Sequence, residues 1–249
     1  MILDAQLMLP SNPSPQNLSS QLSSVTNPNA KALPPTERTD EHFIERHATF
    51  LTQSKETTVR LLFLGDSITR RWVDYPKLWN GFFAHYQPAN FGVGGEVAQS
   101  LLWRIQNGEL DHIQPEVVVL LIGTNNAPTH SGSEIAATIR LIVATIQMKL
   151  SKAKILLMAI FPRGPQDQSK SDENNPYYMD VINTANELLS SLDDKDSIHF
   201  LDIGKSFWGP DGEIDTSLLP DQLHLIGPGY QIWGDALKDI LGRLMTEAN

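Results

Sequence analysis

The sequence predicts an α/β fold, a three-layer α/β/α sandwich in which helices cover both faces of a five-stranded parallel sheet. Five short apolar runs alternate with longer amphipathic stretches along the chain, an order typical of repeated β-α-β units. The run VVVLLIG (117–123) is apolar at nearly every position, as expected of a strand covered on both faces. At 249 residues and 41% hydrophobic, the chain can form one domain with a sizeable core.

The predicted strands are spread along the chain from residue 59 onward. They are VRLLFLG (59–65), PANFG (88–92), VVVLLIG (117–123), KILLMAIF (154–161) and IHFLDIG (198–204). Amphipathic helices are predicted between and after them at 96–106, 133–150, 176–192 and 228–246. A further helix precedes the first strand, where Thr39 or Asp40 can cap it and side chains recur at helical spacing: Phe43, Ile44, His47, Phe50 and Leu51.

The N-terminal segment differs in composition from the rest of the chain. Residues 5–30 carry no charge and are rich in Ser, Pro, Asn and Gln, so they bury too little apolar surface to offset the entropy of ordering. We therefore expect a flexible tail over residues 1–36 and a folded domain over 37–249. The alternative is that the tail packs on the domain as an extended arm.

Composition excludes several classes of function. The formal net charge of -10 disfavours nucleic acid and anionic membrane surfaces as partners, and a chain without cysteine has no disulfide, thiolate metal site or Cys nucleophile. The apolar runs fall far short of the roughly 18 residues that a spanning helix needs, so no stable membrane insertion is expected. Asp4 and Pro10 interrupt the apolar N-terminus, which also lacks the basic start of an export signal. We therefore expect a soluble protein, cytoplasmic rather than secreted.

Open α/β sheets bind ligands beyond the carboxyl ends of their strands, so reactive residues are expected directly after the predicted strands. The first strand is followed by Gly65-Asp66-Ser67-Ile68. A Ser on a tight strand-to-helix turn is exposed, and its backbone N–H lies at a helix N-terminus, where it can stabilise an oxyanion. The alternative is a purely structural role, in which Asp66 or Ser67 caps the following helix.

Further hydrogen-bond donors follow the second and third strands. In NFGVGG (90–95) the glycines let the backbone approach a ligand closely and offer N–H groups toward it. In GTNN (123–126) an Asn amide is a neutral donor suited to an oxyanion. Taken singly, a Gly pair is more often a turn, and a loop Asn more often satisfies backbone groups. His130 follows the same strand and is a candidate for the substrate-binding loop.

A general base for Ser67 must come from one of seven histidines, two of which lie in an Asp-x-x-His pattern. His199, after Asp196, begins the fifth strand and so lies at the N-terminal edge of the sheet. His224, after Asp221, follows that strand and precedes the last helix, on the carboxyl side. This spacing lets a carboxylate bind Nδ1–H and leaves Nε2 to accept the Ser proton. We therefore predict His224 as the base and Asp221 as its orienting partner.

Four motifs resemble, in the same order, the four sequence blocks of the SGNH (GDSL-type) hydrolases. They are GDS (65–67), the Gly of NFGVGG (90–95), GTNN (123–126) and DQLH (221–224). The similarity extends from about Thr39 to Leu244 and implies a flavodoxin-like SGNH hydrolase fold. It also implies a serine esterase that needs no metal or organic cofactor.

The resemblance assigns a role to each matching residue. Ser67 would be the nucleophile, with Asp221 and His224 completing the triad. The oxyanion hole would consist of the backbone N–H groups of Ser67 and Gly95 and the side-chain amide of Asn125.

Within that superfamily the chain looks most like the catalytic α subunits of intracellular platelet-activating-factor acetylhydrolase and their bacterial relatives. The closer match rests on NFGVGG, GTNN, LLWRIQNGEL (101–110), IQP (113–115) and FPRG (161–164). Ile68 and Leu223 flank the Ser and His in sequence and are predicted to wall a small acyl pocket. The resemblance also implies a homodimer. Since the loop 162–178 has its own sequence, the alcohol specificity of those relatives is not carried over.

The leading hypothesis is a serine esterase that hydrolyses short-chain, acetyl-type esters of small molecules through an acyl-enzyme, for example an acetylated phospholipid. Alternatives are a carbohydrate O-acetylesterase of the acetylxylan type and a broad lysophospholipase or arylesterase. A non-catalytic binding module is disfavoured because all four motifs keep their reactive residues. A phosphatase or other metal-assisted hydrolase is disfavoured because it needs a cluster of Asp, Glu or His ligands at the strand ends.

Overall fold

Five parallel strands form a single sheet in the order β2-β1-β3-β4-β5 in the computed structural model, which describes residues 30–164 and 178–247. The strands are β1 (Leu61–Gly65), β2 (Pro88–Gly92), β3 (Val117–Leu121), β4 (Lys154–Met158) and β5 (Ile198–Leu201). All five predicted strands are confirmed, and the strand order is that of flavodoxin-like folds. Each predicted strand except the second is longer than the observed one, because the apolar runs continue into buried loops beyond the ladder.

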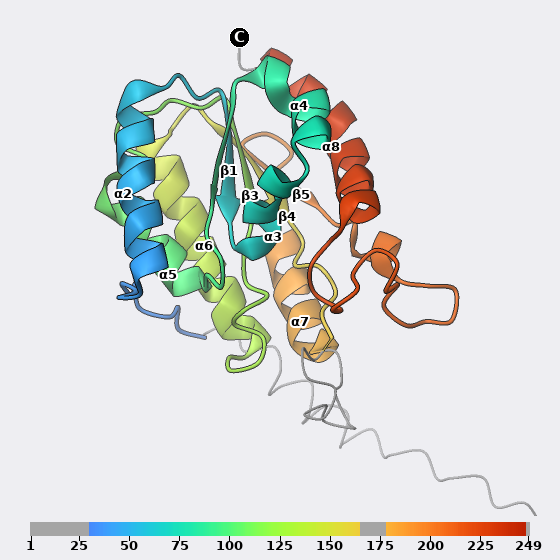
Figure 1. Ribbon diagram of the computed structural model, residues 1–249. Helices are drawn as coiled ribbons and strands as arrows, with labels where there is room; N and C mark the ends of the chain where they lie inside the picture. The colour runs from blue at the N-terminus through green and yellow to red at the C-terminus, as the bar shows by residue number, and fades with distance from the viewer. Residues whose placement is uncertain (1–29, 165–177, 248–249) are drawn as a thin grey trace, which may run out of the picture.

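Helices cover both faces of the sheet, so the predicted three-layer architecture is confirmed (Figure 1). On one face lie α2 (Glu41–Glu56), α5 (Ala98–Arg104), α6 (Gly132–Lys149) and α7 (Met179–Ser190). On the other lie α3 (Ser67–Arg70), α4 (Pro76–Phe83) and α8 (Gly227–Glu247). Strand residues alternate between the two cores, so that Leu62 and Leu64 face the first set of helices and Leu61 and Phe63 the second.

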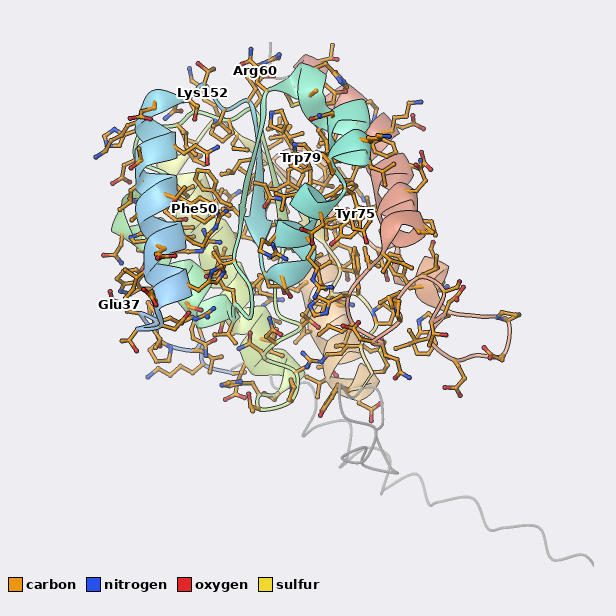
Figure 2. The ribbon with its side chains drawn as sticks, in the orientation of Figure 1. Glu37, Phe50, Arg60, Tyr75, Trp79 and Lys152 are labelled. Carbon is orange, nitrogen blue, oxygen red and sulfur yellow. The ribbon has the colours of Figure 1, made fainter. Side chains whose placement is uncertain are left out.

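Aromatic side chains fill both layers. Figure 2 shows Phe50 between α2 and the sheet, while Trp79 and Tyr75 belong to the α4 side. Phe50 stacks on Phe91 of β2 with ring centroids 4.3 Å apart. In the second layer Trp72 packs against Trp233 at 5.3 Å, which joins the segment after α3 to α8. Such packing fixes the positions of α3 and α8, which flank the site described below.

The register brings the carboxyl ends of the neighbouring strands β2, β1 and β3 level with one another. Gly65, the last residue of β1, lies opposite Gly92 of β2 on one side and Leu121 of β3 on the other. Figure 1 shows these ends at the lower edge of the sheet. The loops after β1, β2 and β3 therefore meet there.

Some local features differ from the sequence prediction. Asp40 caps α2, since its side chain accepts a hydrogen bond from the backbone N–H of Phe43. The helix predicted at 96–106 continues from α5 into a π turn over residues 105–109, in which Gly108 has a positive φ of 104°. The helix expected directly after Asp66 is α3, whereas α4 was not predicted, because a helix this short shows little periodicity.

The predicted tail is described only from residue 30, and residues 1–29 lie outside the described residues. The backbone N–H of Leu33 donates to Thr138 Oγ1 at 2.9 Å, and that of Thr36 to the carbonyl of Gln99 at 3.0 Å. This described part of the segment is therefore held against α5 and α6. No helix in the ranges 30–164 and 178–247 combines the length and apolarity needed to cross a bilayer.

Candidate functional site

The turn after β1 places Ser67 as the first residue of α3. Asp66 caps the helix, with Oδ1 accepting the Ile68 N–H at 2.9 Å. A Cβ at Gly65 would lie 2.2 Å from the carbonyl oxygen of Leu121, so only glycine allows β1 and β3 to approach this closely. Tyr230 on α8 donates its hydroxyl to the carbonyl of Ile68 at 2.6 Å. These contacts fix the Ser67 turn against the sheet and α8.

The structure brings Ser67, His224 and Asp221 together in one hydrogen-bonded chain. Ser67 Oγ lies 2.9 Å from His224 Nε2, and His224 Nδ1 lies 2.6 Å from Asp221 Oδ2. Gln222 has a left-handed φ of 55°, and its carbonyl accepts the Gly164 N–H at 2.8 Å. The loop after β4 thus supports the tight turn that carries Asp221 and His224.

The carboxyl group of Asp221 is held in its ionised form. Burial opposes ionisation, but hydrogen bonds from the backbone N–H and the ring of His224, together with one from the Leu223 N–H, keep the pKa of Asp221 below its usual range. An ionised Asp221 at this distance favours a proton on Nδ1 of His224, which leaves Nε2 free to accept one.

The predicted oxyanion donors lie on adjacent segments. Asn125 Nδ2 donates to the carbonyl of Glu96 at 2.9 Å, which brings the amide next to the Gly95 turn. Gly95 has a φ of +67°, and the Gly94 carbonyl accepts a hydrogen bond from Arg38 Nη1 at 2.9 Å. Within the described ranges, the backbone N–H groups of Ser67 and Gly95 have no hydrogen-bond acceptor. They remain available to a ligand.

A charge network with a fully buried centre, which the sequence did not predict, lies behind the Gly95 turn. Arg104 Nη2 pairs with Glu96 Oε2 at 2.7 Å, and Arg104 Nη1 donates to Glu109. Glu109 also binds His47 Nδ1 at 2.8 Å. Burial raises the pKa of Glu96 to about 7, although the attraction of Arg104 opposes this. Because removing one partner would leave a buried charge, the network constrains the shape of the turn that carries Gly95.

Two further buried charges adjoin the site and were also missed. Burial raises the pKa of Asp66 to about 7, and its Oδ2 has no hydrogen-bond partner within the part of the chain that the structure describes. Arg163 Nη1 donates to the carbonyl of Thr124 at 2.7 Å and contacts Asn125 Oδ1 at 3.4 Å. The sequence signal for Arg163 was the motif FPRG, to which no role was assigned. Among the described residues, no three His, Asp or Glu side chains cluster as metal ligands would.

Other candidates from the sequence lie apart from this chain of contacts. His199 is on β5, where its Nε2 lies 3.0 Å from the carbonyl of Asp196. His130 Nδ1 lies 2.8 Å from the hydroxyl of the neighbouring Thr129. Most of the loop 162–178, over residues 165–177, lies outside the described residues.

The two residues predicted to wall an acyl pocket are buried. Ile68 and Leu223 are each 1% exposed and belong to the core between the sheet and α8. In this structure they present little surface to a ligand. Their role in an acyl pocket stays a prediction, beside the alternative that Leu223 is a core residue that holds the His224 loop.

Comparison with known proteins places this geometry in context. A profile of the GDSL-like Lipase/Acylhydrolase family matches residues 63–232, which is more than half of the chain. The chain is 31% identical over 228 residues to platelet-activating factor acetylhydrolase IB subunit alpha1 of Bos taurus, covering 91% of this chain and 94% of that protein.

Solved structures share the fold at lower sequence identity. A GDSL-like lipase from Bacteroides thetaiotaomicron VPI-5482 is similar with a TM-score of 0.65 and 20% identity, over 80% of this chain and 97% of that one. The acetyl xylan esterase AlAXEase is similar with a TM-score of 0.57 and 20% identity, over 74% of this chain and all (100%) of that one.

Proposed function

The chain belongs to the GDSL-like Lipase/Acylhydrolase family, within the SGNH hydrolases, and is an esterase, and we propose that it removes short acyl groups through an acyl-enzyme formed on Ser67. The observation that supports this most is the unbroken chain from Ser67 Oγ through the His224 ring to Asp221, with contacts of 2.9 and 2.6 Å. A hydroxyl so placed can lose its proton to the ring as it attacks a carbonyl.

In the first half of the reaction, Ser67 Oγ forms a bond to the ester carbonyl carbon and its proton passes to His224 Nε2. Asp221 stabilises the imidazolium and holds the ring. The carbonyl oxygen becomes an anion that accepts hydrogen bonds from the backbone N–H groups of Ser67 and Gly95 and from the Asn125 amide. The tetrahedral intermediate then expels the alcohol, which takes its proton from His224, and the acyl group remains on Ser67.

In the second half, water replaces the alcohol. His224 removes a proton from the water as its oxygen attacks the acyl carbon, and the same donors stabilise the second anion. Collapse breaks the bond to Ser67 Oγ, which regains a proton from His224, and the carboxylic acid leaves. No redox partner enters this sequence, and the protein is returned to its starting state.

We propose an acetyl ester as the substrate, with an acetylated phospholipid as the first class to test. The relatives at 31% identity are named as platelet-activating factor acetylhydrolase subunits, which supports this class. A sugar O-acetyl ester is the second candidate, because an acetyl xylan esterase shares the fold. The homodimer implied by the sequence resemblance is likewise a proposal, to be checked by analytical ultracentrifugation.

The first experiment compares wild type with Ser67→Ala on p-nitrophenyl acetate. We expect a loss in kcat of at least about a thousandfold with an unchanged melting temperature, because alanine fits the same turn. Ser190→Ala is the matched control, since this exposed serine ends α7 and should leave kcat unchanged. A Ser67→Ala rate above about a tenth of wild type would overturn the proposal.

The second experiment assigns the substrate class. Wild type is given an acetylated ether phospholipid, acetylated xylan and a series of p-nitrophenyl esters at equal ester concentration, and released acid is measured. The proposal predicts the highest kcat/KM on the phospholipid. Faster release from xylan would replace that substrate class with the carbohydrate one while leaving the serine esterase intact.

A further inference from the structure

The side chain of Asn125 is held at both ends by groups from different loops. Its Nδ2 donates to the Glu96 carbonyl at 2.9 Å, and Arg163 Nη1 contacts its Oδ1 at 3.4 Å. The same Nη1 makes a shorter bond of 2.7 Å to the carbonyl of Thr124, the preceding residue. Arg163 therefore holds the backbone that carries Asn125 and also faces the oxygen of its amide.

These contacts determine which way the amide points. If the amide were turned over, its oxygen would face the Glu96 carbonyl and its NH₂ would face the Arg163 guanidinium. Both contacts would then be repulsive, because an acceptor would face an acceptor and a donor would face a donor. In the observed orientation one N–H of Nδ2 binds Glu96, and the second N–H is left to serve an oxyanion.

Burying the charged side chain of Arg163 at this position costs free energy. The residue is only 6% exposed, and burial lowers the pKa of its guanidinium, although Tyr178, Asp66 and Asp221 attract the cation. Its Nε is buried and has no hydrogen-bond partner among residues 30–164 and 178–247. Arg104, the fully buried arginine, is neutralised by two carboxylates, whereas no carboxylate among the described residues forms an ion pair with Arg163. Among the described residues, its guanidinium donates instead to the Thr124–Asn125 segment.

We propose that Arg163 is a positioning residue that orients Asn125 so that its second amide N–H points at the oxyanion. This inference rests on the proposed function, in which Asn125 is an oxyanion donor. Arg163 acts through Asn125 and does not touch the substrate. Because an oxyanion exists in the transition state and not in the bound ester, loss of Arg163 lowers kcat and leaves KM nearly unchanged.

The test is a double-mutant cycle between Arg163 and Asn125, with p-nitrophenyl acetate as the probe. Asn125→Ala removes the donor and should lower kcat by ~10²–10³-fold. Arg163→Met removes the positioning bonds and should lower kcat by ~10–10²-fold, with KM changed by less than about threefold. In the Asn125→Ala background, Arg163→Met should cost less than about a further threefold, because the group that it positions is already gone.

Two more variants keep the test decisive. Arg163→Lys can still donate to the Thr124 carbonyl and should recover part of the lost kcat, and it serves as the second arm of the cycle if Arg163→Met does not fold. Arg140→Met is the structural control, because Arg140 also bonds a backbone carbonyl, that of Leu188, but at the far end of α7. It should lower the melting temperature and leave kcat intact.

The outcomes separate the two proposals. If Arg163 variants lower kcat by the same factor with and without Asn125, or raise KM at normal kcat, the positioning role is overturned while the esterase assignment stands. If Ser67→Ala remains active in the same assay, the proposed function itself fails and the positioning role fails with it.

Discussion

Asp221 binds His224 at two points, with Oδ2 lying 2.6 Å from ring Nδ1 and Oδ1 accepting the backbone N–H at 2.7 Å. One carboxylate therefore both shapes the loop and selects the ring tautomer. The two effects can be separated, because each bond needs an acceptor oxygen and a carboxylate offers two, whereas an amide offers only one.

Asp221→Asn should keep the loop and lose the activity. The amide oxygen can still accept the His224 backbone N–H, but the NH₂ group would face Nδ1 and favour the tautomer with the proton on Nε2. We expect kcat to fall by ~10³–10⁴-fold with a small change in melting temperature. Asp196→Asn, in the other Asp-x-x-His pair, is the control and should leave kcat unchanged. Retention of wild-type kcat by Asp221→Asn would remove Asp221 from the mechanism.

His224→Ala should reduce kcat by at least about a thousandfold, and His199→Ala should leave it largely intact. The first ring contacts Ser67 Oγ, whereas the second contacts the backbone carbonyl of Asp196, just before β5. Steady-state kinetics of the two purified variants on p-nitrophenyl acetate make the comparison. An inactive His199 variant beside an active His224 variant would contradict the assignment of His224 as the base. It would also contradict the prediction that His199 lies at the edge of the sheet opposite to the site.

The choice between these histidines was possible from sequence, because alternating strands and helices fix which end of each strand a residue follows. A residue at the start of a parallel strand lies at the opposite edge from one that follows its end. Ser67, Gly95 and Asn125 likewise follow the ends of β1, β2 and β3, which places them at the same edge of the sheet. Motif order along the chain then supplied the roles by resemblance.

Contacts between distant segments could not be predicted in this way. The network of Glu96, Arg104, Glu109 and His47 joins two helices and two loops, and each member alone resembles an ordinary charged surface residue. Arg163 gains its role only where the loops after β3 and β4 meet. The burial of Ile68 was likewise not evident from its adjacency to Ser67 in the sequence. Successive helical residues point about 100° apart, and Ile68 faces the core.

The raised pKa of Asp66 predicts a specific dependence of stability on pH. Burial raises the pKa from 3.8 to about 7, so between these values the folded protein binds more protons than the unfolded chain. The contribution of Asp66 to the unfolding free energy therefore falls as pH rises through this window and becomes constant above about pH 7. Asp66→Asn has no proton to lose at this site and lacks this slope.

Denaturant unfolding of both proteins between about pH 5 and about pH 8 measures the difference. Wild type should lose stability relative to Asp66→Asn as pH rises. Glu96, whose pKa is also raised to about 7, titrates in both proteins, and in wild type its charge adds to the raised pKa of Asp66. Asp74→Asn, at an exposed carboxylate, should run parallel to wild type. A constant difference between wild type and Asp66→Asn across the range would show that Asp66 is ionised throughout.

The last prediction concerns acyl length. If Ile68 and Leu223 wall the acyl pocket, wild-type kcat/KM should fall steeply from acetyl to butyryl esters. A filled apolar pocket rejects added methylenes at a cost of ~1–3 kcal/mol, which lowers kcat/KM about tenfold or more. Leu223→Ala should then shift the preference toward longer chains while the triad still turns over. If Leu223 only supports the His224 loop, as its 1% exposure would also allow, the variant should lose activity on every chain length in proportion.

Leu219→Ala is the matched control, because Leu219 is a fully buried leucine of the same core. Both substitutions leave a cavity and should lower the unfolding free energy by ~2–5 kcal/mol, so a shared loss of stability cannot by itself explain a difference in specificity. The deciding quantity is the ratio of hexanoyl to acetyl kcat/KM. A ratio that rises in Leu223→Ala and not in Leu219→Ala supports the pocket, whereas an unchanged ratio with lower rates in Leu223→Ala assigns Leu223 to the support of the base.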